Sequence, residues 1–220
     1  MMEIELAPIF QIACDKMDEN RLAFNQADSI NAYHGDHMVE IFTIAVKAAR
    51  EKQAEGLAEA MDYAGLLLDE MQANASAQVY GRGLKQLGVQ FNKYGITLDD
   101  LVTYMQKALK EENNNEEISK DTTPRARARS KEVLVALVSA LAGWRQSETG
   151  QDKAAAVVDL NYMFDLGVAY VQAKQRNTRR IEVIADAAAS VSPLSSVPYR
   201  YESGKLAIAT LLGAMAKIGF

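Results

Sequence analysis

The chain has 220 residues, of which 49% are hydrophobic and 24% charged, and a formal net charge of −5. This length is sufficient for one substantial core and does not require a second domain. The acidic balance argues against a nucleic-acid binder, and no apolar run approaches the roughly 20 residues that cross a bilayer. The single cysteine, Cys14, excludes an internal disulfide. Together with the lack of a signal-peptide pattern, it predicts a cytoplasmic protein.

Long proline-free tracts predict helix along most of the chain. Only four prolines occur, with none in 9–123 or 125–192. Apolar residues recur at helical spacing within 38–48, 57–71, 133–144, 157–171 and 208–218. Thr97 and Asp100 form a capping-box pattern that predicts a helix from there to Leu109. Because no segment alternates between apolar and polar residues, we expect an all-α single domain over 1–220. Its expected architecture is an antiparallel bundle or barrel of about eight helices.

Both histidines lie in one short polar segment, Tyr33-His34-Gly35-Asp36-His37, with Asp28 shortly upstream. Carboxylates and imidazoles at the start of a helix are groups from which a metal-phosphate site is built. The same residues also suit an ordinary turn between helices, with two solvated histidines. A zinc site is not expected, because neither a cysteine pair nor a clear third ligand accompanies His34 and His37.

One long polar stretch interrupts the helices, from Glu111 to Arg129. It begins with acidic residues and asparagines and ends with Arg125, Arg127 and Arg129. Irregular segments of this length are usually functional or disordered. Two interpretations stay open: a flexible solvated connector at about 111–129, or arginines that fold over an anionic ligand such as a nucleotide phosphate.

Four segments occur in the order of a known family and span nearly the whole chain. Residues 28–38 stand where that family has an Asp followed by Asp-x-Asp-His-Gly, and residues 73–81 where it has a Gly-Gly-x-Ser-Gly phosphate loop. Residues 97–101 match the start of the next helix, and residues 202–205 stand in place of a late Asp-Pro-Gly-Ala turn. In these segments the chain resembles the nucleotide-binding subunit of dihydroxyacetone (glycerone) kinase, the DhaL type.

The resemblance implies a barrel of antiparallel helices that binds ADP or ATP with Mg²⁺. In that family three aspartates hold two magnesium ions, which bridge the phosphates of a tightly bound ADP. The nucleotide relays a phosphoryl group to dihydroxyacetone, which a different subunit holds. A kinase partner subunit is therefore one expected partner, and a second copy of the chain is another.

By this resemblance, the metal ligands are Asp28, His34 and Asp36. Asp36 and His37 match the second aspartate and the histidine of the family segment. His34 replaces the first aspartate, and a neutral imidazole is a poorer magnesium ligand than a carboxylate. Asp28 matches the upstream aspartate only with a one-residue insertion; otherwise Ser29 takes its place.

The nucleotide contacts implied by the resemblance are Ser76, Ala77, Gly81 and Gly204. Ser76 and Gly81 keep the identity of the family residue, and Gly204 is retained from the late turn. Ala77 replaces a glycine of the phosphate loop. Its Cβ restricts positive φ and hinders close approach of the backbone to a phosphate.

These departures share a direction, because the fold pattern is kept while the ligand-binding residues are lost. We therefore expect a degenerate relative, a pseudoenzyme without assigned catalytic residues that acts as a binding or assembly module. The alternative is a divergent but active kinase subunit that transfers phosphate to dihydroxyacetone or a similar small hydroxy compound. Positioning and charge stabilisation do most of the work in that reaction, so relocated arginines could still support it.

Overall fold

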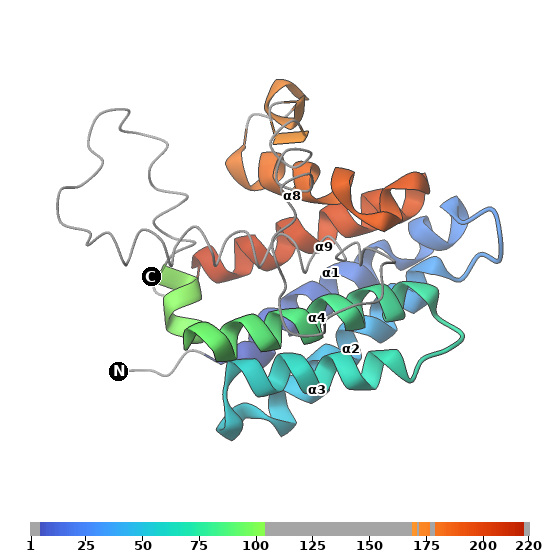
Figure 1. Cartoon of the computed structure of the whole chain (residues 1–220). Coiled ribbons are helices and arrows are strands. Elements are labelled where there is room, and N and C mark those ends of the chain that lie inside the picture. The colour runs from blue at the N-terminus through green and yellow to red at the C-terminus, as the bar shows by residue number, and fades with distance from the viewer. Residues whose placement is uncertain (1–4, 104–168, 171, 177–178, 218–220) are drawn as a thin grey trace, which may run out of the picture.

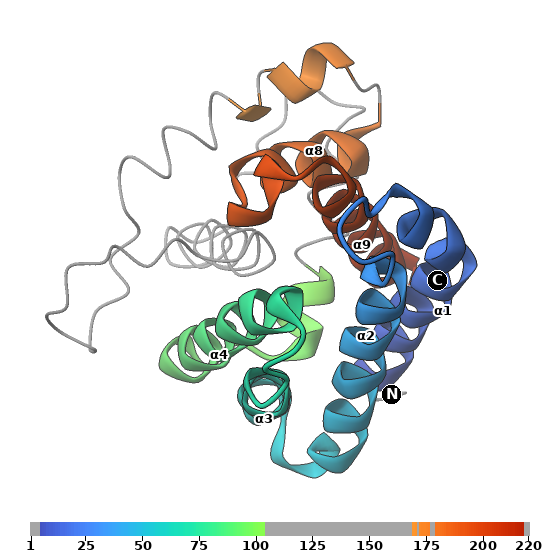
Figure 2. The same ribbon diagram turned by 90° about the vertical axis from the view of Figure 1, so that its right-hand side faces the viewer.

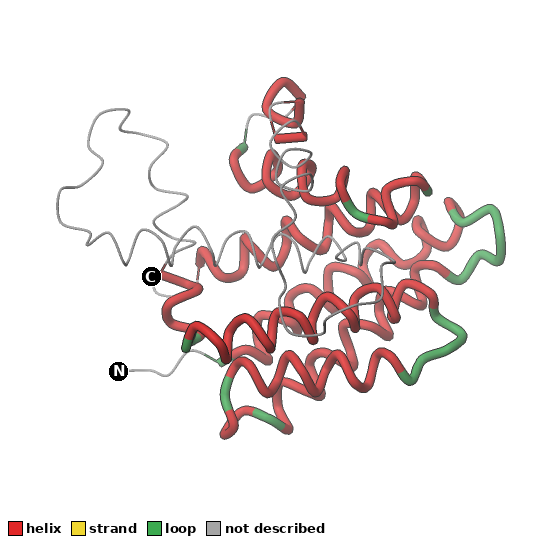
Figure 3. The backbone as a smooth tube through the Cα atoms, in the orientation of Figure 1, coloured by secondary structure: helices red, strands yellow, loops and turns green. Residues whose placement is uncertain are grey.

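The computed structural model of the chain describes residues 5–103, 169–170, 172–176 and 179–217, except for the side chains of Tyr94, Pro193 and Leu194. These residues form α-helices, short 3-10 helices and turns, and no strand occurs among them (Figure 3). The prediction of an all-α single domain of about eight helices, with neighbouring helices antiparallel, is confirmed (Figure 1). The polar stretch 111–129, the helix predicted at 133–144 and most of that at 157–171 lie outside the described residues, as does the part after residue 103 of the helix predicted to reach Leu109.

Successive helices pack as antiparallel neighbours and form an arc. The elements are α1 (Leu6–Ala27), α2 (His34–Glu51), η1 (Gln53–Glu55), α3 (Leu57–Asp69), α4 (Ala75–Tyr94), α8 (Arg180–Val191), η3 (Pro193–Ser196) and α9 (Pro198–Lys217). The tightest partners are α1 with α2, α3 with α4, and α8 with α9, and contacts of α1 with α9 and α2 with α3 join these pairs. Viewed along the bundle, the helices follow the order α4, α3, α2, α1, α9, α8 (Figure 2).

The core includes the apolar faces predicted from helical spacing, together with apolar residues of α1 and α4. Burial of these side chains is the main favourable term that holds the helices together. None of the described helices is long and apolar enough to span a membrane. The buried members of the predicted faces are Met38, Ile41, Phe42, Ala45, Ala48, Leu57, Met61, Ala64, Leu68, Ile208, Leu211, Leu212 and Met215.

Two helix pairs approach closely at glycines. A Cβ at Gly35 would lie 2.0 Å from the carbonyl oxygen of Arg21, so α1 and α2 cross at a distance that only glycine permits. A Cβ at Gly65 would lie 2.6 Å from the carbonyl oxygen of Gly81, and α3 and α4 cross in the same way. The glycine of the histidine segment is therefore a packing residue.

The bundle has two distinct ends. At one end, called the polar end here, lie the 28–33 loop and the first turns of α2, α4 and α9 (Figure 1). At the other, called the pocket end, lie the start of α1, η1, and the turn at 95–99. The capping box predicted at the pocket end is confirmed: the Asp100 amide donates to the Thr97 hydroxyl at 3.2 Å, and that hydroxyl donates to Asp100 Oδ2 at 2.8 Å.

Candidate functional site

Asp28 lies in the loop between α1 and α2 and is buried at the polar end. Its Oδ1 accepts the Ile30 amide at 3.0 Å, and the Tyr199 hydroxyl donates to the same carboxylate. Burial alone raises the pKa of Asp28, but these hydrogen bonds, with those from the 31 and 33 amides, outweigh it and hold the pKa below its usual value. Asp28 is therefore an ionised carboxylate whose partners come from its own loop and from α9.

His34, the first residue of α2, is 3% exposed. Its Nε2 lies 2.7 Å from the Ser203 hydroxyl oxygen, which is also 3.1 Å from the Arg200 carbonyl oxygen. The direction of the bond between His34 and Ser203 depends on which ring nitrogen carries the hydrogen. The ring packs 4.8 Å from that of Tyr199. Burial, together with the positive charge of Arg200, lowers the pKa of His34 to about 4, so the imidazole is neutral near neutral pH.

Asp36 engages a different set of partners, on α1. Its Oδ2 accepts from Asn25 Nδ2 at 2.7 Å, and its Oδ1 lies 3.9 Å from the Arg21 guanidinium. The Asn25 side-chain oxygen in turn accepts the amides of Gly35 at 2.7 Å and Asp36 at 3.2 Å. Asn25 thus satisfies amides that the first turn of α2 would otherwise leave without partners. The segment 34–36 is the capped start of a helix.

The arrangement does not suit the predicted magnesium site. Asp28 and His34 are linked through Tyr199, whereas Asp36 points to α1. The His34 nitrogen that faces Ser203 is already engaged by that hydroxyl at 2.7 Å. Among the described residues, no group of three or more His, Cys, Asp or Glu side chains is placed to hold a metal ion. The metal assignment to these three residues finds no support in their positions.

The predicted phosphate loop is the capped N-terminus of α4. Asn74, 1% exposed, accepts the Ala77 amide with its side-chain oxygen at 3.0 Å and donates to the His37 carbonyl at 3.2 Å. Ser76 and Ala77 are buried in the first turn. A bound phosphate would use amides of this turn, and Asn74 already occupies that of Ala77.

The two predicted nucleotide-binding glycines lie inside helices. Gly81 is in α4, where an added Cβ would meet the Gly65 carbonyl at 2.9 Å, so its role is close packing. Gly204 is in α9, and a Cβ there would lie 3.6 Å from the Tyr80 hydroxyl. The cavity between Tyr80, Gly204 and Arg200 measures about 10 Å³. That volume holds about one water molecule and excludes a nucleotide.

The resemblance to DhaL-type subunits rests on the sequence segments alone. Comparison with protein-family models, with curated proteins and with solved structures finds no match for this chain. The chemistry of the polar end must therefore be argued from its own contacts.

A buried ion-pair network beside the polar end has no counterpart in the sequence analysis. Asp186 of α8, with its side chain 2% exposed, lies 3.1 Å from the Arg176 guanidinium and 3.6 Å from Lys205 Nζ. The Tyr201 hydroxyl also donates to this carboxylate. The available signal was an aspartate within the otherwise apolar run 183–189, since charged residues are rarely buried without partners.

Proposed function

We propose that this chain is a non-catalytic relative of the DhaL-type kinase subunits, whose helical fold serves as a binding or assembly module. The supporting observation is that each predicted metal ligand already has protein partners. Asp28 is held by the Ile30 amide and Tyr199, His34 by Ser203, and Asp36 by Asn25. A cation would have to displace these hydrogen bonds, and a buried polar group that loses its partner costs about 1–3 kcal/mol.

The 28–33 loop supplies the surface for such a module. Ile30 and Tyr33 are 75% and 60% exposed although both are largely apolar. They stand on a loop whose backbone is held by two local hydrogen bonds, from the Ile30 amide to Asp28 and from the Tyr33 amide to Asn31. A firmly held loop loses little conformational freedom on binding, which favours contact with another protein. The expected occupant is a partner subunit or a second copy of the chain.

One observation favours the alternative of an active nucleotide-dependent subunit. Arg200, in the first turn of α9, has a buried Nε without a hydrogen-bond partner among the described residues. A guanidinium at a helix N-terminus is a suitable group for phosphate. The arginines at 125, 127 and 129, predicted as further phosphate contacts, lie outside the described residues.

Nucleotide binding separates the two functions. We expect native mass spectrometry of the purified chain to show no retained ADP. We also expect its melting temperature to be the same with Mg-ATP as with MgCl₂ at equal ionic strength. The matched variant is Arg200→Gln, which keeps much of the side-chain length but removes the charge.

Retained ADP, or a saturable rise in melting temperature with Mg-ATP that Arg200→Gln abolishes, would establish the alternative. If the rise also requires Asp28 and Asp36, tested as Asp28→Asn and Asp36→Asn, the metal assignment would be restored. These assays need no partner subunit, so a missing partner cannot silence them.

Assembly through the loop is tested by sedimentation velocity over a range of concentrations. We expect self-association, or association with a supplied kinase partner subunit, that the double variant Ile30→Ser with Tyr33→Ser weakens. Val89, which is 60% exposed on α4, provides the control substitution Val89→Ser. If Val89→Ser weakens the association as much as the double variant does, the 28–33 loop is not the contact surface.

A further inference from the structure

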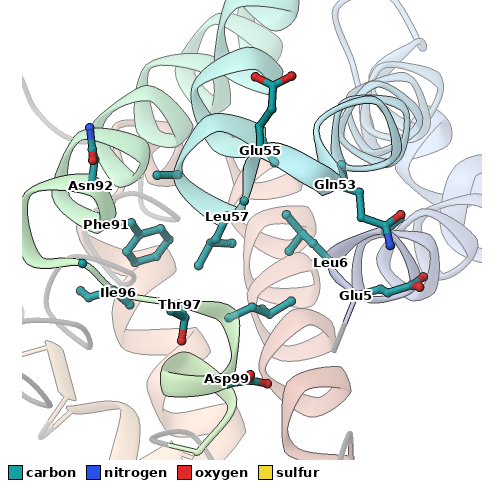
Figure 4. A pocket seen from close by; sticks show the side chains of 17 residues that line it. Glu5, Leu6, Gln53, Glu55, Leu57, Phe91, Asn92, Ile96, Thr97 and Asp99 are labelled. Carbon is teal, nitrogen blue, oxygen red and sulfur yellow. The ribbon is translucent and has the colours of Figure 1, made fainter. Parts of the chain in front are cut away.

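A cavity lies at the pocket end, on the opposite side of the bundle from the polar end. Its volume is about 480 Å³, and it is bordered by the start of α1, by η1 and the start of α3, and by the end of α4 with the 95–99 turn (Figure 4). Pockets of about 300–1,000 Å³ are the usual size for small-molecule ligands. None of the residues predicted from the sequence as ligand-binding lines it.

Apolar side chains form one wall of this pocket. Side chains of Leu6, Leu57, Phe91 and Ile96 point toward the shared space (Figure 4). Phe91 and Leu57 are 1% and 9% exposed, so they form a packed wall and not a mobile surface. An apolar body of moderate size would bury its surface against this wall, and the transfer from water favours binding.

The charged residues that line the pocket are all acidic. They are Glu5, Glu55 and Asp99, and among the described residues no Lys, Arg or His lines it. Glu55 is paired with Lys52 at 2.8 Å. Glu5 and Asp99 have no ion pair among the described residues, and Figure 4 shows them apart from each other, one at the start of α1 and one in the 95–99 segment. The dipoles of the helices that begin and end here oppose one another, so the carboxylates set the sign of the local potential.

From this geometry we propose that the pocket binds a small organic cation, with an apolar body against Leu57 and Phe91 and an ammonium or guanidinium group at the acidic rim to which Glu5 and Asp99 belong. The apolar wall supplies affinity and the two carboxylates supply selectivity for charge. A neutral ligand of the same shape loses the second contribution. An anion meets repulsion. The proposal is independent of the function of the polar end, because no residue is shared between the two.

The test uses three probes of one shape: 2-phenylethylamine, which is cationic at neutral pH, 2-phenylethanol and phenylacetate. Amide chemical shifts of the ¹⁵N-labelled full chain are followed by NMR during each titration. We expect the amine to shift resonances from 53–58 and 91–99, the alcohol to bind about tenfold more weakly, and phenylacetate not to bind.

Charge-removing variants of the same shape connect the selectivity to named residues. Glu5→Gln and Asp99→Asn should each weaken amine binding about threefold, as expected for partly exposed charge pairs, while binding of the alcohol is unchanged. Glu59→Gln is the matched control, since Glu59 is exposed on α3 and does not line the pocket. Equal affinity for amine and phenylacetate, shifts confined to the polar end, or no binding of the amine at millimolar concentration would overturn the proposal.

Discussion

The two ends of the bundle differ in where polar residues and open space lie. The end with the most polar motif has little open space, and the other end has the larger pocket. At the polar end, Asp28 and His34 have partners on α9 and Asn74 has one on α2, and the cavity between α4 and α9 measures about 10 Å³. At the pocket end, apolar side chains surround about 480 Å³, and two carboxylates lack an ion pair among the described residues. The polar residues predicted as a binding site thus hold helices together, while residues outside any recognised motif line the pocket.

The largest expected effect is on the ion-pair network next to the polar end. Asp186→Asn removes the negative charge that faces Arg176 and Lys205, leaving those cations without their buried counter-charge. Because Arg176 and Lys205 are partly exposed, water compensates part of this loss, but the buried carboxylate also accepts from Tyr201. We therefore expect a cost of about 2–3 kcal/mol in the free energy of unfolding, measured by urea denaturation. Asp18→Asn, at an exposed carboxylate 3.4 Å from Arg21, is the control and should cost less than about 0.5 kcal/mol. If both substitutions lower the free energy of unfolding by the same amount, the contacts of Asp186 do not stabilise the fold beyond an exposed ion pair.

The second prediction concerns pH and His34. Its pKa is about 4 in the fold against an ordinary 6.5, so the unfolded chain binds this proton first as pH falls. The stability contribution is complete above pH 6.5 and is lost between 6.5 and about 4, by about 2 kcal/mol. His34 faces Arg200, which opposes its protonation, and Asp28, which favours it; His37 adds a smaller opposing charge.

Urea denaturation as a function of pH checks this prediction. His34→Gln keeps a donor for Ser203 and should flatten the loss of stability over that interval. His37→Gln is the control and should leave the His34 contribution in place. A wild-type profile that is already flat between pH 6.5 and 4 would show that the imidazole is not buried in solution.

The third prediction tests how much the Asn74 side chain stabilises the start of α4. Asn74→Ala removes the cap on the Ala77 amide and the bond to the His37 carbonyl, and should cost about 1–2 kcal/mol in the free energy of unfolding. Asn92→Ala, near the end of the same helix, should change stability by less than about 0.5 kcal/mol. The reverse order would mean that the first turn of α4 does not need this cap.

Local patterns in the sequence were sufficient to predict most of the fold. Helical spacing identified the buried faces of α2, α3 and α9, and Thr97 with Asp100 identified a cap, because both depend on residues close in the chain. The site could not be predicted in this way. The partner of His34 is Ser203, at a separation of 169 residues. Without that partner the sequence suggests a metal ligand or a solvated side chain, whereas with it His34 is a buried link between α2 and α9. The pocket could not be predicted either, since its lining residues share no motif.

The smallest expected effect compares one backbone conformation at the two ends. Ala32 in the polar-end loop and Gly95 in the pocket-end turn both have φ of +59°, a left-handed conformation that glycine adopts without strain. Ala32→Gly should therefore stabilise the fold by about 0.5–1 kcal/mol, and Gly95→Ala should destabilise it by a similar amount. A Cβ at Gly95 meets no atom within 4 Å, so its cost is conformational and not steric. Thermal unfolding of the two variants measures both values. A destabilising Ala32→Gly would mean that the loop does not hold this φ in solution, and the pre-organised surface proposed for Ile30 and Tyr33 would lose its basis.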